Sequence, residues 1–117
     1  MTQHMDGENV LLRIFIDKFQ RWHLDATYSQ IVQKARKRGL AGATVLEGVE
    51  GFGQSGKLMR ERPWLPSNEE VIVEIIDEDS KVRAFLEEIE PMLKDALVTL
   101  ERARVARYIA QGRRVAL

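Results

Sequence analysis

The chain has 117 residues, enough for one domain with a core of its own but too few for a second. Its 18 basic residues equal its 18 acidic residues, which excludes a bulk electrostatic attraction to nucleic acid or anionic lipid. It contains no cysteine, which excludes disulfides, thiolate catalysis and zinc sites with cysteine ligands. No apolar run approaches the roughly 18 residues of a membrane helix, and residues 1–9 are polar, unlike a signal peptide. We therefore expect a cytoplasmic protein with a flexible N-terminus and no direct insertion into a membrane.

The first predicted elements are a strand and a helix. Val10–Ile16 is rich in branched and aromatic residues, as strands are, and both of its faces are largely apolar. Asp25 is expected to cap the helix that follows, and Gly39 to end it. The buried face of that helix is indicated by the i, i+3, i+4, i+7 spacing of Tyr28, Ile31, Val32 and Ala35.

The next two strands are separated by a long connection. Residues 43–49 and 71–76 are apolar and typical of strands, whereas the residues between them far exceed the usual handful in a loop. Asp79 or Ser80 is expected to cap a second helix, which is predicted to end before Pro91. Residues 96–109 favour a helix by composition and a strand by their run Leu97–Leu100, and we predict a strand.

This order predicts an α+β fold of the ferredoxin-like type, βαββαβ. Its four strands form one antiparallel sheet, and its two helices lie on one face of that sheet. We assign this domain to residues 10–110, the flexible N-terminus to 1–9 and a C-terminal tail to 111–117. The strands carry apolar side chains on both faces, so the face without helices needs a partner, and self-association is the simplest one.

The long connection is the first candidate functional segment, from about residue 50 to 69. Gly51 and Gly53 on either side of Phe52 could let the backbone approach an anion closely, or could simply form a flexible turn. The same segment carries three cations, which as a cluster suggest contact with an effector or a partner, although neighbouring glutamates largely neutralise them: Lys57, Arg60 and Arg62.

A second basic group lies on the last predicted strand. Arg102 and Arg104 are two residues apart and are expected to project from one face. They could bind phosphate groups, or they could be edge charges that prevent aggregation. The sequence leaves both interpretations open.

Enzyme and RNA-binding functions have little support. No Ser, His and Asp set occurs in a recognisable motif, so we name no catalytic residue and expect no enzyme. His4 and His23 are far apart and lie in polar segments, so we expect no metal site. Residues 71–76 lack the aromatic residues that stack on RNA bases, so we expect no nucleic-acid partner.

Three segments together resemble a known family. Residues 41–53 read AGATVLEGVEGFG, residues 73–77 read VEIID and residues 85–89 read FLEEI. They resemble the PII-like proteins classified as domain of unknown function 190, over residues 10 to 109. The resemblance implies a homotrimer whose sheets face inward and whose clefts between subunits bind a nucleotide or another small anionic effector. It also implies that the long loop contacts a regulated membrane transporter or channel, or an enzyme. A structural or adaptor trimer without a ligand remains an alternative, and a phosphate-ester hydrolase a weaker one.

Overall fold

Four strands form one antiparallel sheet in the order β4–β7–β1–β8. The computed structural model describes residues 9–52, 58–60 and 69–115. Strands β1 and β7 occupy the centre and pair along their full lengths, from Asn9↔Glu78 to Asp17↔Glu70. The order confirms the predicted ferredoxin-like fold. The four strands are β1 (Asn9–Asp17), β4 (Thr44–Glu47), β7 (Glu70–Glu78) and β8 (Ala96–Ala103).

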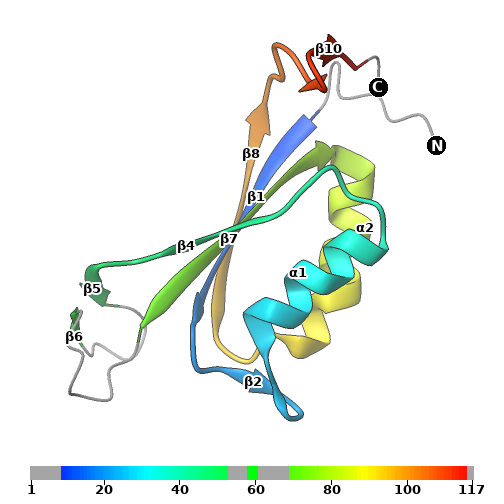
Figure 1. Ribbon diagram of the computed structural model, residues 1–117. Coiled ribbons are helices and arrows are strands. Elements are labelled where there is room, and N and C mark those ends of the chain that lie inside the picture. The colour runs from blue at the N-terminus through cyan, green and yellow to red at the C-terminus, as the bar shows by residue number, and fades with distance from the viewer. Residues whose placement is uncertain (1–8, 53–57, 61–68, 116–117) are drawn as a thin grey trace.

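Both α-helices cover the same face of this sheet (Figure 1). They are α1 (Thr27–Lys37) and α2 (Asp79–Ile89), and a 3₁₀ turn at Glu90–Met92 follows α2. Alternate residues of β1 and β7 point at the helices, as the two-residue period of a strand requires. The core is therefore formed by buried side chains of these two strands and of both helices, including Leu12, Ile14, Val73, Ile75, Ile31, Val82, Phe85 and Ile89.

The helix starts differ from those expected. Asp25 lies in a two-residue strand, β3 (Asp25–Ala26), which pairs with β2 (Arg21–Trp22), and α1 has Ala26 at its N-cap without a side-chain cap. The amide of Thr27 instead donates to the carbonyl of Gln20. Asp79 is the first residue of α2 and pairs with Arg83 one turn later. Neither α1 nor α2 therefore has the side-chain cap that was predicted.

The long connection after β4 contains strands of its own. β5 (Glu50–Phe52) and β6 (Leu58–Arg60) pair antiparallel, with Glu50 opposite Arg60. The backbone of the two arms is thus hydrogen-bonded as a ribbon, which the glycine content of the segment did not indicate.

The last strand is shorter than predicted. β8 ends at Ala103, opposite Asn9, where its partner β1 begins. Beyond that point β9 (Ile109–Ala110) and β10 (Arg113–Arg114) form a small hairpin, and Gln111 and Gly112 take the positive φ angles, 54° and 73°, that its two-residue turn requires. A strand needs a neighbour for its backbone groups, and the chain supplies one here by folding back on itself.

Candidate functional site

The structure describes part of the first candidate segment. Gly51 and Phe52 lie in β5, and Arg60 lies in β6. Gly53, Lys57 and Arg62 lie outside the described residues. The ribbon formed by β5 and β6 continues from β4. In its register Glu50 is opposite Arg60, so one acidic and one basic residue lie where the ribbon begins.

The second candidate group lies at the other end of the sheet. Arg102 is level with Val10 at the start of β1, and Arg104 follows the end of β8 by one residue. The ribbon leaves the sheet near the other end of β1, where Asp17 is opposite Glu70. At about 3.4 Å per residue, the two ends of the nine-residue strand β1 are roughly 27 Å apart. One copy of the chain therefore does not bring the two predicted groups together, and Figure 1 shows β5 and β6 far from the C-terminal hairpin.

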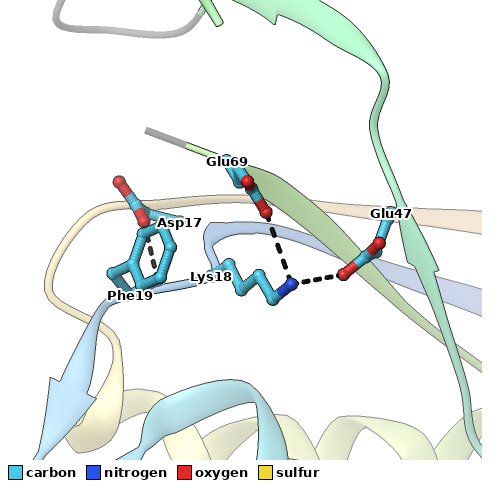
Figure 2. Close-up of polar contacts among 5 residues, drawn as sticks. All are labelled: Asp17, Lys18, Phe19, Glu47 and Glu69. Carbon is cyan, nitrogen blue, oxygen red and sulfur yellow. Dashed lines mark hydrogen bonds and ion pairs between the residues drawn. The ribbon is translucent and has the colours of Figure 1, made fainter. Parts of the chain in front are cut away.

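Lys18 braces the place where the ribbon meets the sheet (Figure 2). It follows β1, and its Nζ lies 2.6 Å from Oε1 of Glu47 at the end of β4 and 3.3 Å from Oε2 of Glu69 just before β7. Two backbone bonds reinforce the same junction, from the Lys18 amide to the Glu69 carbonyl at 2.6 Å and from the Gly48 amide to the Glu70 carbonyl at 2.8 Å. Both ends of the 50–69 segment are thus tied to the end of β1.

The two carboxylates also change the acidity of the lysine. The hydrogen bond to Glu47, followed by that to Glu69, raises the pKa of Lys18 above its usual value. The ammonium group therefore stays charged throughout the physiological range. Lys18 was not predicted from the sequence, although a base directly after a predicted strand was a visible signal.

Asp77 holds the segment that leads into β4. Its carboxylate is buried, and Oδ2 accepts a hydrogen bond of 2.9 Å from the Ala41 amide and lies 3.7 Å from Nζ of Lys81. Oδ1 accepts one of 2.6 Å from the Glu78 amide. Asp77 thus lies near the end of β7, where its carboxylate fastens the segment that leads into β4.

The sheet face opposite the helices is striped. We call it the open face, because the described helices leave it uncovered. Paired residues of the four strands align there in rows, since opposite residues in a sheet project to the same side. The apolar row is Leu46, Ile72, Phe15 and Leu97, in strand order.

The next row on this face is polar. It consists of Thr44, Glu74, Arg13 and Thr99, again in strand order, and we call it the polar row. Nε of Arg13 lies 2.8 Å from Oε2 of Glu74, and its Nη1 lies 2.5 Å from Oε1 of Glu101 on β8. These carboxylates raise the pKa of Arg13 still further, with the hydrogen bond to Glu74 as the largest cause. Beyond the polar row, Ile76 and Leu11 are again apolar.

The described residues hold no cluster of three His, Asp or Glu side chains suited to a metal ion. Within the same residues, no helix combines the length and the apolar character needed to cross a membrane.

The fold resembles that of PII-like signalling proteins. The chain superposes with a TM-score of 0.64 on CPII from Thiomonas intermedia K12, a structure bound to ADP and bicarbonate, covering 86% of this chain and 91% of that one at 14% identity. It superposes with a TM-score of 0.61 on Arabidopsis thaliana PII bound to citrate, covering 93% of this chain and 90% of that one at 18% identity. At these identities the likeness shows the fold.

The sequence comparisons are more specific. A UPF0166 protein of Aquifex aeolicus is 38% identical over 96 residues, which cover 81% of this chain and 90% of that protein. The sequence model of domain of unknown function 190, described as "Uncharacterized ACR", matches residues 9–105. The chain belongs to this family, which confirms the resemblance found in residues 41–53 and around β7 and α2.

Proposed function

We propose that this protein is a PII-like regulatory module that assembles as a homotrimer, binds a nucleotide or another small anion between subunits, and contacts a regulated partner through residues 50–69. The PII-like fold supports the general class. The observation that carries the proposal is the separation of the two candidate groups. The ribbon and the arginines lie at opposite ends of one sheet, so a site that uses both must lie between copies.

The open face supports assembly. Its apolar row includes Leu46, 44% exposed, and Leu97, 60% exposed. Burying a few hundred Å² of such surface in each copy, at about 25 cal/mol per Å², stabilises the assembly by several kcal/mol. The chain is also extended for its length, with a radius of gyration of 15.7 Å against roughly 13 Å for a compact domain of this size. Both features fit a subunit that packs against copies of itself.

The C-terminal segment supports an anionic effector. Residues 102–115 contain five arginines and no acidic residue, in a chain whose total charge is balanced. Guanidinium groups bind phosphate and carboxylate through two parallel hydrogen bonds, so this segment offers several donors for an anionic ligand. We propose Arg102 and Arg104 as effector ligands contributed to a neighbouring copy.

The ion pairs of Lys18 with Glu47 and Glu69, at what we call the root of the ribbon, support the proposal that effector binding is communicated to the partner. Lys18 ties both ends of the 50–69 segment to β1. A displacement at the end of β1 would therefore also move the end of β4 and the start of β7. We propose that this segment contacts a membrane transporter or channel, or a cytoplasmic enzyme, and that the protein itself is not catalytic.

The test is a thermal-shift and calorimetry series with ATP, ADP, citrate and bicarbonate on the full chain. A ligand at about 100 times its dissociation constant stabilises the folded state by roughly 2.7 kcal/mol, which is readily measured. The variant Arg102→Ala with Arg104→Ala should lose most of this stabilisation, whereas Arg36→Ala, an exposed arginine on α1, should keep it. Equal binding by both variants would remove these arginines from the site.

The alternative is an adaptor trimer without a small-molecule ligand. The observation that favours it is the braced root, because Lys18 is already paired with two carboxylates and could serve a purely structural purpose. An assembled protein that none of the four ligands stabilises would favour the adaptor over the sensor. Release of phosphate from a phosphate ester by the purified protein would instead support the hydrolase.

A further inference from the structure

The open face combines an apolar row and a polar row, a pattern typical neither of a solvated sheet face nor of a hydrophobic core. Leucine, isoleucine and phenylalanine fill the apolar row on all four strands. The polar row beside it crosses the same four strands with two threonines, one glutamate and one arginine. A solvated face would not carry the apolar row, and a featureless hydrophobic interface would not carry the polar one.

The charges in the polar row are already paired within one copy. Arg13 donates from Nε to Glu74 and from Nη1 to Glu101, so it can be covered without becoming an isolated charge. Glu101 is 57% exposed, and a carboxylate can accept more hydrogen bonds than the one from Arg13. The polar row can thus be buried against a surface that offers hydrogen-bonding groups at the same position along the strands.

We infer that the polar row sets the register in which one copy of the chain packs on the next. This inference rests on the assembly proposed above and goes beyond it, because it assigns the choice of a single arrangement to Arg13, Glu74 and the two threonines. A second copy is the occupant whose surface matches, since it brings the same apolar row at the same distance from the same polar row.

The register is fixed because aligned and shifted arrangements of two copies differ in which side chains meet. When the rows of the two copies are aligned, apolar side chains contact apolar side chains, and the ion pairs contact groups that can hydrogen-bond. A shift by two residues along a strand would press Arg13 and Glu74 against Phe15 or Ile72 of the neighbour, which leaves paired charges facing apolar surface. A single polar feature in an apolar interface acts in this way in other assemblies, where it excludes alternatives at some expense of affinity.

The test compares two versions in which the charged residues of the polar row and Glu101, the second carboxylate paired with Arg13, are all replaced, and it uses native mass spectrometry. The apolar version carries Arg13→Met, Glu74→Leu and Glu101→Gln, and the matched polar version carries Arg13→Gln, Glu74→Gln and Glu101→Gln. We expect the polar version to keep the single oligomer of the wild type. We expect the apolar version to associate at least as tightly but to distribute over several oligomeric states. A single wild-type-like species from the apolar version would overturn the inference.

A second measurement uses the absence of cysteine and leaves the row's charges in place. Thr44→Cys with Thr99→Cys puts thiols at the two ends of the polar row, on strands β4 and β8, which are about 14 Å apart within one copy. A short bifunctional maleimide should join chains of this variant, but not chains of the row-mismatched variant Leu46→Cys with Thr99→Cys. Equal joining in both variants overturns the register, whereas a monomeric wild type overturns the assembly itself.

Discussion

Arg13 and Glu74 face each other directly across β1 and β7, with Nε and Oε2 2.8 Å apart, on the side of the sheet opposite both helices. The core on the other side of the same strands is apolar at this level. The ion pair between two apolar stretches therefore distinguishes this face of the sheet from the face that the helices cover. It is also why we interpret the open face as an interface with a preferred arrangement.

The Lys18 brace should control the opening of the ribbon root. Replacing Lys18 by Met removes the ammonium that joins Glu47 and Glu69. We expect the Gly48 amide, which donates to Glu70 nearby, to exchange its hydrogen several-fold faster, while the Val73 amide in the sheet is unaffected. Hydrogen exchange read by mass spectrometry or NMR measures both.

The control for this experiment is Lys94→Met, which removes an exposed lysine elsewhere on the surface. Its exchange pattern should match the wild type. If the Gly48 amide exchanges at the same rate in the wild type and in Lys18→Met, the brace has no mechanical effect.

Asp77→Asn should destabilise the fold by about 1–3 kcal/mol. The buried carboxylate accepts hydrogen bonds from two backbone amides on its two oxygens, and an asparagine can accept at only one of these positions. Urea denaturation at fixed protein concentration measures the loss. The exposed Asp95→Asn is the control and should change the free energy of unfolding by less than about 0.5 kcal/mol. Equal effects of the two substitutions would mean that Asp77 does not fasten the start of β4.

The link between the helices should weaken at acidic pH. Arg38 donates to both oxygens of Glu88, and these bonds hold the pKa of Glu88 below its ordinary value. A carboxylate with a lowered folded-state pKa stabilises the fold fully above its unfolded-state pKa, about 4.3, and less as pH falls through the folded-state value. The variant Glu88→Gln should therefore be less stable than the wild type at pH 7 but match it at about pH 2.

This prediction is checked by thermal unfolding of both proteins across that pH range. The neighbouring Glu87 lies on the exposed side of α2. Because an exposed carboxylate adds little to stability at pH 7, Glu87→Gln should match the wild type in stability at every pH. A stability difference for Glu88→Gln that stays constant from pH 7 to pH 2 would contradict the assigned pairing.

The core should be sensitive where the helices meet the sheet. Ile14→Ala removes a fully buried side chain from the central strand and should lower the free energy of unfolding by about 2–5 kcal/mol. Leu24→Ala, at a position 87% exposed, should change it by less than about 0.5 kcal/mol. Chemical denaturation of both variants at one protein concentration makes the comparison. A loss at Ile14 no larger than that at Leu24 would be inconsistent with the packing described.

The main elements could be predicted from the sequence because their signals are local. The spacing of Ile31 and Ala35 identifies α1, and the mostly apolar, branched residues of β1 and β7 identify the two central strands. The helix caps could not be predicted, because the chain before Thr27 uses a backbone bond to Gln20 where a side-chain cap was expected.

The functional surfaces were harder to predict because they depend on pairing between distant strands. Arg13, Glu74 and Glu101 are far apart in the sequence, and they meet only through the register of β1 with β7 and β8. The same holds for Lys18, whose partners lie 29 and 51 residues away. In contrast, the expectation that one face of the sheet needs a partner followed from strands that are apolar on both faces in a fold whose two helices lie on one face.

Multi-angle light scattering of the purified protein at micromolar concentration measures whether three copies of the chain assemble. We expect one species with three times the 13.5 kDa mass of the chain. We also expect Phe15→Glu, which places a charge in the apolar row of the open face, to shift this species to monomers. A stable wild-type monomer of 13.5 kDa would contradict the assembly, the effector site between subunits and the role of the polar row together.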